Sequence, residues 1–192
     1  MNQHITGVIL AGGAGARFGG ADKGLLACAG RPFIEWVLAR VQPQVGPLLI
    51  SANRHSGHYA RYGFPIIADE PQGHAGPVAG IQAALAQVQT AFALIVPVDA
   101  LRLPDDLALR LYTALGDGDA AVVHDGRAQI PVCCLLRTRC RVRFAGESAR
   151  SVKEVLLDLG ARDVNFDSHP REFWSCNTPA ELSALEKALI WN

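Results

Sequence analysis

Close to its start the chain reads Ile5-Thr-Gly-Val-Ile-Leu-Ala-Gly-Gly-Ala-Gly-Ala-Arg-Phe-Gly-Gly-Ala-Asp-Lys23. Residues 5–10 form an apolar run with β-branched members that stops at a cluster of glycines. A short run of this kind is typical of a strand that is buried on both faces of a sheet. We therefore predict that residues 5–10 are the first strand of a parallel sheet and that a glycine-rich loop follows it.

The next segments repeat this strand-and-helix pattern. Pro32 precedes apolar residues at helical spacing and is predicted to lie in the first turn of a helix. Short apolar runs predict strands, and longer runs with helical spacing predict helices. Such alternation predicts an α/β protein with a three-layer, doubly wound, mainly parallel sheet. The predicted strands are residues 48–52, 65–68 and 92–98, and the predicted helices are residues 33–41, 55–61, 77–88 and 107–115.

The pattern changes in the last third of the chain. Apolar segments at residues 120–124 and 130–136 flank Asp125-Gly126, a turn signal that favours an antiparallel pair and therefore a mixed sheet. Thr178-Pro-Ala-Glu181 has the residues of a capping box and predicts the start of a final helix. With 192 residues and no linker or repeat, we expect one domain over residues 1–192.

Composition excludes several classes of partner. The 18 basic and 18 acidic residues cancel, so no overall field attracts nucleic acid or a membrane. The start of the chain resembles no targeting signal and no apolar run reaches spanning length, so we expect a cytoplasmic protein. The five cysteines show no C-x-x-C spacing and are expected to be buried thiols, while the six histidines give little support to a zinc site.

The glycine-rich loop over residues 10–23 suits phosphate binding. Glycine lets the backbone approach a ligand so that successive N–H groups point at phosphate oxygens, and Arg17 and Lys23 add positive charge. A Walker loop is excluded because Gly24, rather than serine or threonine, follows Lys23. A dinucleotide fingerprint is excluded because three residues separate Gly15 from Gly19. A flexible turn that is merely rich in glycine remains the alternative.

The loop as a whole resembles the signature loop of nucleotidyltransferases with the nucleotide-diphospho-sugar transferase fold, a Rossmann-like fold. Six further segments follow in the order found in molybdenum cofactor guanylyltransferases, and together they span nearly the whole chain. They are Ser51-Ala-Asn-Arg-His55, Asp69, Gly76-Pro-Val-Ala-Gly80, Pro97-Val-Asp99, Val123-His-Asp-Gly126 and Asn177-Thr-Pro179.

The resemblance implies a magnesium-dependent transfer of GMP from GTP to molybdenum-molybdopterin, with release of pyrophosphate. It also implies a nucleotide-binding N-terminal part, a pterin-binding C-terminal part, and as partners other molybdenum-cofactor biosynthesis proteins and apo-molybdoenzymes or their chaperones. The resemblance implies that Asp99 holds Mg²⁺ and that Lys23 contacts the phosphates. It also implies that Arg17, Lys23 and Asp99 are the catalytic residues. The implied binding residues are Leu10, Ala11, Gly12, Gly13, Gly20, Lys23, Ser51, Asp69, Gly76, Gly80 and Asp99 for the nucleotide and its metal, and Asn177 towards the pterin.

Elementary chemistry supports Asp99 independently of the resemblance. It follows the most apolar predicted strand, and the carboxyl ends of parallel strands open into the ligand crevice of such sheets. Magnesium prefers carboxylate and phosphate oxygens, so one aspartate, a triphosphate and water molecules can hold it. The structural alternatives are a turn or helix cap for Asp99, a strand end for Asp69, a helix start for residues 76–80 and a solvated lysine for Lys23.

Some positions depart from the family pattern. Val98, Ala100 and Leu101 flank Asp99 in place of the usual residues, and Ser51 and Ser175 stand where asparagine is common. The rival functions are a cytidylyltransferase, which Gly12-Gly13 disfavours, a sugar-phosphate nucleotidyltransferase, and a non-catalytic module that binds GTP or carries the cofactor. Because phosphoryl transfer depends on positioning and charge neutralisation, we leave His55, His124 and Asp125 outside the catalytic set.

Overall fold

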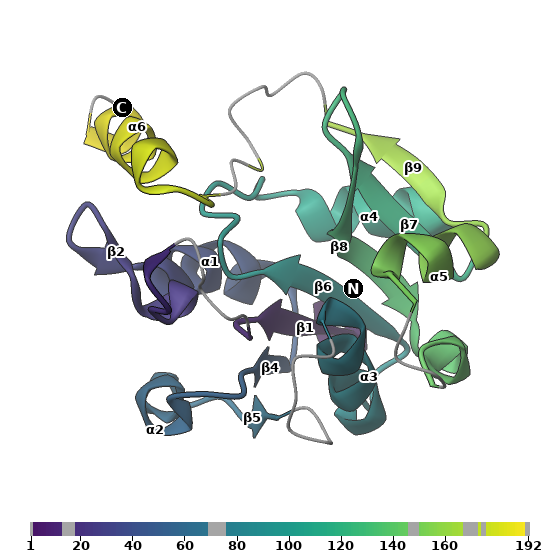
Figure 1. The fold of residues 1–192 in the computed structure, drawn as a ribbon. Coiled ribbons are helices and arrows are strands. Elements are labelled where there is room, and N and C mark those ends of the chain that lie inside the picture. Colours follow the sequence, from purple (N-terminus) through teal and green to yellow (C-terminus); the bar gives the residue numbers. More distant parts are fainter. Residues whose placement is uncertain are drawn as a thin grey trace.

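A seven-stranded mixed sheet forms the centre of the protein in a computed structural model (Figure 1). The structure describes residues 2–12, 18–68, 76–145, 150–166, 173 and 176–190. The strand order is β5-β4-β1-β6-β8-β7-β9, and only β8 runs antiparallel to its neighbours. The predicted doubly wound, mainly parallel mixed sheet is therefore confirmed. The strands are β1 (Ile5–Leu10), β4 (Leu48–Ser51), β5 (Ile66–Ile67), β6 (Phe92–Pro97), β7 (Ala120–His124), β8 (Gln129–Arg137) and β9 (Arg162–Asn165).

Helices cover both faces of this sheet. On one face a hydrophobic cluster joins the sheet to α1 (Phe33–Val41) and α4 (Leu107–Leu115). On the other face a second cluster joins it to α3 (Pro77–Gln87) and α5 (Val152–Asp158). The remaining helices are α2 (Ser56–Tyr59) and α6 (Pro179–Ile190), and short 3-10 helices span Asn2–His4, Lys23–Leu25, Gln42–Gln44, Ala60–Tyr62 and Thr138–Arg143.

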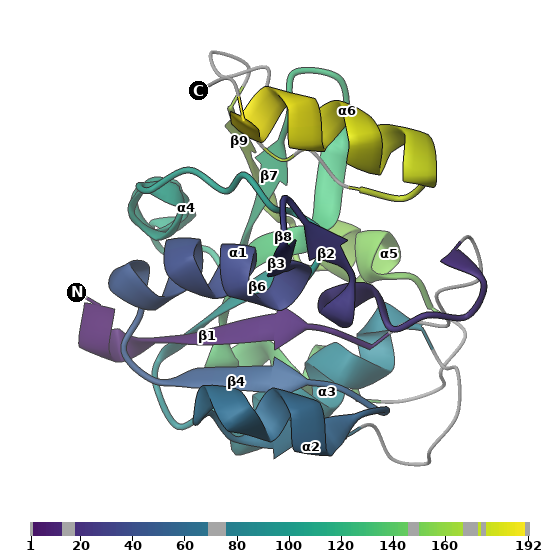
Figure 2. The same cartoon turned by 90° about the vertical axis from the view of Figure 1, so that its left-hand side faces the viewer.

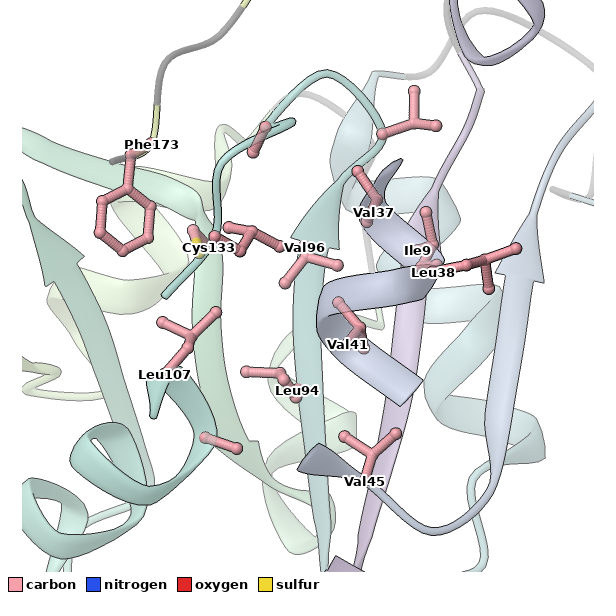
Figure 3. Close-up of a cluster of buried hydrophobic side chains, with 14 of the residues drawn as sticks. Ile9, Val37, Leu38, Val41, Val45, Leu94, Val96, Leu107, Cys133 and Phe173 are labelled. Atoms are coloured by element: carbon pink, nitrogen blue, oxygen red, sulfur yellow. The ribbon is translucent and has the colours of Figure 1, made fainter. Parts of the chain in front are cut away.

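The strand pattern explains the two hydrophobic layers. Alternate residues of a strand point to opposite faces, so an all-apolar strand supplies both clusters. In β6, Leu94 and Val96 pack towards α1 and α4, whereas Ile95 packs towards α3 and α5. Figure 3 shows Leu94 and Val96 with Val41 of α1 in the first layer. Alternate side chains of the same strand thus supply the apolar surface on each face of the sheet, and helices cover both faces.

Most predicted elements are confirmed, but some were missed. The structure adds a small hairpin of β2 (Ala27–Cys28) and β3 (Arg31–Pro32), the helix α5 and the edge strand β9. Pro32 has extended backbone angles and precedes α1 as its N-cap, so the prediction that it lies in the first turn was wrong. All five cysteines are free and buried, as predicted.

The strand order reverses next to β1. From β1 the chain proceeds to β4 and β5 on one side, and then crosses to β6 on the other side. In open α/β sheets, ligands bind at the carboxyl ends of the strands where the order reverses. The topology therefore predicts a ligand site beside the ends of β1 and β6.

The C-terminal helix α6 lies against the β2–β3 hairpin, and Figures 1 and 2 both show the two side by side. The backbone N–H of Ala29 donates to Glu186 Oε1 at 3.1 Å. The predicted capping box is present, because Glu181 N donates to Thr178 Oγ1 and Thr178 N donates to Glu181 Oε2. The bond from Ala29 links α6 to the N-terminal part of the chain, and the capping box defines where α6 begins.

Within the ranges given above, no helix has the length and apolar character needed to cross a membrane.

Truncating Leu94 tests the importance of the central layer. Leu94 is completely buried in β6, whereas Leu109 of α4 is 50% exposed and provides a matched control. We expect Leu94→Ala to lower the free energy of unfolding by about 2–5 kcal/mol, because it leaves a cavity in a packed core. Leu109→Ala should change it by less than about 0.5 kcal/mol. Urea denaturation of both variants measures the difference, and equal losses would contradict the layer assignment.

Candidate functional site

Three polar side chains from distant parts of the chain meet at one point. The Lys23 ammonium forms an ion pair with Asp99 Oδ2 and donates to Asn177 Oδ1 at 2.7 Å. The side chains of Lys23 and Asp99 are 20% and 14% exposed, so the ion pair is sheltered but still reachable. Three residues of the predicted site are thus neighbours in space, although up to 154 positions separate them in the sequence.

The ends of β1 and β6 bring Lys23 and Asp99 together. Leu10 and Pro97 are paired in register at the carboxyl ends of these strands, and Val98 N donates to Leu10 O at 3.1 Å. Lys23 begins the 3-10 helix that follows the loop after β1, and Asp99 lies in the turn after β6. The three side chains therefore meet at the strand ends where the reversal of strand order predicts a ligand site.

Asn177 reaches this point because α6 is capped immediately after it. The backbone N–H groups of Asn177 and Thr178 donate to Glu181 Oε2 at 2.7 and 2.9 Å. The bond from the Asn177 N–H is the largest influence that lowers the pKa of the Glu181 carboxyl. A charged Glu181 therefore holds the backbone of Asn177, while the side chain of Asn177 contacts Lys23.

The residues predicted to line the nucleotide lie along the same edge of the sheet. Leu10 is aligned with Ser51 at the end of β4, and Ala11 N donates to Ser51 O at 2.8 Å. Ser51 and Ala11 are buried, whereas Gly12 is exposed at the start of the loop. The sheet therefore brings these predicted residues to the edge that carries Asp99.

Two of the predicted glycines have backbone angles that favour glycine. Gly20 has a φ of +85° and Gly76 has a φ of +74°, both in the left-handed region. The Gly20 carbonyl accepts a hydrogen bond from Arg54 Nη1 at 3.1 Å. Gly80 is buried within α3, so its predicted contact with a nucleotide stays a prediction.

Gly13, Arg17, Asp69 and Ser175 lie outside the described residues, and the expectations for them stay predictions.

A buried carboxylate that was not predicted from the sequence, Asp22, lies next to Lys23. Asp22 accepts hydrogen bonds from the Tyr59 hydroxyl at 2.5 Å and from Gly24 N at 3.1 Å, and His55 Nδ1 lies 3.0 Å from its other oxygen. The signals available in the sequence were an acidic residue before Lys23 and an aromatic residue in the polar stretch at residues 55–61.

His124 and Asp125 stabilise a turn between β7 and β8. Gly126 N donates to His124 Nδ1 at 3.1 Å, and the N–H groups of Arg127 and Ala128 donate to Asp125 Oδ1. These backbone bonds, with Ala128 first, lower the pKa of the Asp125 carboxyl. Local hydrogen bonding thus accounts for both side chains without a catalytic role.

At this site the negatively charged carboxylate of Asp99 lies beside the ammonium group of Lys23, which Asn177 also contacts. No cluster of three or more histidine, cysteine, aspartate or glutamate side chains that could hold a metal occurs in the described part of the chain. Burial raises the pKa of the neighbouring Cys176 thiol to about 11, although Lys23 acts in the opposite direction. Cys176 is therefore a neutral thiol at pH 7, and the metal-ligand role expected for Asp99 stays a prediction.

Comparison with known proteins gives the family. The model of the MobA-like NTP transferase domain matches residues 7–164. A protein named molybdenum cofactor guanylyltransferase from Shewanella amazonensis is 38% identical over 194 residues, which cover 98% of this chain and 99% of that protein. A protein of the same name from Yersinia pseudotuberculosis is 36% identical over 190 residues, which cover 97% of each chain.

A solved structure agrees on the fold. The molybdopterin-guanine dinucleotide biosynthesis protein A from Archaeoglobus fulgidus superimposes with a TM-score of 0.78 and 22% identity, over 97% of this chain and all of that one. The predicted family, fold class and enzyme class are confirmed. The chain belongs to the molybdenum cofactor guanylyltransferase family of nucleotidyltransferases.

Proposed function

We propose that the protein transfers GMP from GTP to the terminal phosphate of molybdenum-bound molybdopterin and releases pyrophosphate. An oxygen of the acceptor phosphate attacks the α-phosphorus of GTP, and the bond from the α-phosphorus to the oxygen that bridges it to the β-phosphorus breaks. The observation that carries this proposal is the meeting of Lys23, Asp99 and Asn177 at the ends of β1 and β6. The family membership and the names of the relatives support the choice of substrates.

Each residue of the site has a role in this reaction. Positive charge at Lys23 stabilises the departing pyrophosphate, and backbone N–H groups of the loop after β1 orient the phosphates. Arg17 belongs to the same loop and adds a second positive charge. Asn177 limits the positions of the Lys23 ammonium by accepting one of its hydrogen bonds. Catalysis then depends on positioning and charge neutralisation, as in other phosphoryl transfers.

A magnesium ion fits this site. The Asp99 carboxylate already attracts a cation, the Lys23 ammonium, and it lies where the triphosphate is expected. Asp99 would hold the ion together with phosphate oxygens and water, a set of hard oxygen ligands that Mg²⁺ prefers. When bound, Mg²⁺ supplies charge neutralisation at the reacting phosphates.

The unusual residues on either side of Asp99 do not argue against catalysis. Val98, Ala100 and Leu101 are all buried in the hydrophobic cluster that contains α1 and α4. Their side chains therefore pack inside the protein, and Asp99 alone among these four residues presents a charged group. This favours an active enzyme over the non-catalytic GTP-binding or carrier module.

The remaining assignments follow from the proposed reaction. The N-terminal part binds the nucleotide, with Asp69, Gly76 and Gly80 in its pocket, and the C-terminal part provides the pterin wall near Asn177. The partners are other proteins of molybdenum-cofactor biosynthesis and the apo-molybdoenzymes or chaperones that receive the product. The site of action is the cytoplasm.

A reconstituted reaction tests the proposal directly. Purified protein is incubated with GTP, Mg²⁺ and molybdenum-loaded molybdopterin, and both products are measured. We expect equal amounts of pyrophosphate and the guanine dinucleotide. Tight GTP binding without either product, even with saturating acceptor, would instead identify a non-catalytic binding module.

Replacing Asp99 tests the role of its carboxylate. Asp99→Asn keeps the size of the side chain but removes the charge that holds the metal. We expect kcat/KM to fall by a factor on the order of 10²–10³, because several kcal/mol of charge stabilisation are lost. The matched control is Asp105→Asn, which breaks the exposed ion pair with Arg40 and should leave kcat/KM within about twofold of the native value. A fully active Asp99→Asn variant would exclude Asp99 as the metal ligand.

Nucleotide preference separates guanylyl transfer from its rivals. A ligand that binds only the folded state increases the free energy of unfolding by RT ln(1 + [L]/Kd) and so raises the melting temperature. We expect GTP with Mg²⁺ to stabilise the protein more than CTP or UTP does at equal concentration. Stabilisation by CTP or UTP but not by GTP would reassign the enzyme to the cytidylyltransferases or the sugar-phosphate nucleotidyltransferases.

A further inference from the structure

We propose that Asp22, held by Tyr59 and His55, is a positioning residue that fixes the backbone on both sides of Lys23 and aims its ammonium at the phosphates of the nucleotide. The inference rests on the proposed function for the identity of the ligand. It assigns a role to three residues that form no hydrogen bond or ion pair with Asp99 or Asn177 in the described part of the chain. We call Asp22, Tyr59 and His55 the Asp22 brace.

The Asp22 carboxylate is buried, and its hydrogen-bond partners are the other two brace residues and the backbone of Gly24. Its side chain is 5% exposed. Oδ1 accepts from Gly24 N at 3.1 Å and from the Tyr59 hydroxyl at 2.5 Å, while Oδ2 faces His55 Nδ1 at 3.0 Å. Lys23 is directed away to Asp99, so in the described part of the chain the side-chain partners of the Asp22 carboxylate are Tyr59 and His55. A buried carboxylate needs such donors, and both of its oxygens have one.

Tyr59 fits under the turn that carries Lys23, and this fit requires glycine at position 24. A Cβ atom on Gly24 would lie 2.3 Å from the Tyr59 hydroxyl oxygen and 3.1 Å from Val98 Cγ2. The Tyr59 side chain is completely buried. The Tyr59 hydroxyl and the Val98 side chain therefore both approach Gly24 closely, and Val98 is the residue before Asp99.

The Tyr59 hydroxyl is a permanent donor. Burial raises its pKa, and the hydrogen bond to Asp22 raises it further. The hydroxyl consequently stays protonated throughout the physiological range of pH. Its bond to Asp22 is a fixed part of the site.

The segment that supplies Tyr59 and His55 also holds the loop at a second place. Arg54 Nη1 donates to Gly20 O at 3.1 Å. His55 has a φ of +52°, a left-handed conformation that is uncommon for residues other than glycine. Such a conformation persists only where the surrounding contacts determine it, and the bond to Asp22 is one of these contacts.

These contacts fix the backbone at positions 22 and 24 and leave Lys23 between them. A lysine side chain on a mobile loop would have to be ordered when the ligand binds, which weakens binding. Here the ordering is complete before the nucleotide arrives, because the brace fixes the backbone and Asp99 and Asn177 fix the ammonium. A role for Tyr59 in packing alone would stabilise the fold without acting through Lys23.

A labelling experiment tests the brace without any nucleotide. The chain has three lysines, and Lys153 and Lys187 are exposed references for the reactivity of Lys23 towards an amine-acylating reagent. We expect Tyr59→Phe to raise the labelling rate of Lys23 several-fold relative to the references. The matched control is Tyr62→Phe, which removes a hydroxyl bonded to Glu35 at 3.2 Å and should leave the rate unchanged. Equal rates in Tyr59→Phe and the native protein would overturn the proposal.

Nucleotide affinity then tests whether the brace acts through Lys23. We expect Tyr59→Phe to weaken GTP binding about 10-fold, the scale of one hydrogen bond to a charged group. In a Lys23→Met background the same change should alter the Kd for GTP less than twofold, because interacting positions are not additive. Equal losses in both backgrounds would show a general structural role and overturn the proposal.

The two measurements separate this inference from the proposed function. Because labelling uses no nucleotide, it remains informative even where the reconstituted reaction yields no product. If Tyr59→Phe does not fold, Asp22→Asn replaces it, since the amide oxygen keeps one acceptor while the charge is lost, and the same increase in Lys23 labelling is expected. Increased labelling with unchanged GTP affinity would refute the role in phosphate binding.

Discussion

The parallel pairing of β1 with β6 is the constraint on which the site depends. Six residues of each strand are in register, from Ile5 with Phe92 to Leu10 with Pro97. This register brings the loop after β1 and the turn after β6 out of the sheet side by side. A shift by one residue would exchange the buried faces of a strand and is therefore strongly opposed in a sheet covered on both sides. The same packing that stabilises the core thus sets the distance between Lys23 and Asp99.

Local periodicity explains which elements could be predicted from the sequence. The strands β1 and β6 and the helices α1 and α4 are apolar in patterns that belong to one segment alone, and their positions were predicted closely. The edge strand β9 has one buried residue, Val164, among four, so it carries no such pattern. The β2–β3 hairpin has strands of two residues each and is too short for any periodicity. In contrast, α5 could have been found from the capping box of Ser151 and Glu154.

The candidate site was predictable where a motif marks one position, and unpredictable where two distant segments must meet. Lys23 and Asp99 were identified from the loop and from the end of an apolar strand. The contact of Asn177 with Lys23 depends on how α6 packs against the β2–β3 hairpin, and no local pattern encodes that packing. The bond between Asp22 and Tyr59 likewise depends on where α2 lies after the β4 strand has joined the sheet. Elements are encoded locally, while the contacts among their ends arise from tertiary packing.

The position of Asn177 also has a consequence for protein synthesis. The residues of β1, β4 and β6 leave the ribosome early, and domains can begin to fold while the chain is still growing. Contacts between residues far apart in sequence form late because a long loop must close first. We therefore expect Lys23 and Asp99, which follow the paired strands β1 and β6, to approach each other before Asn177 joins them. The docking of α6 against the β2–β3 hairpin would then complete the side-chain contacts of Lys23 as a late step of folding.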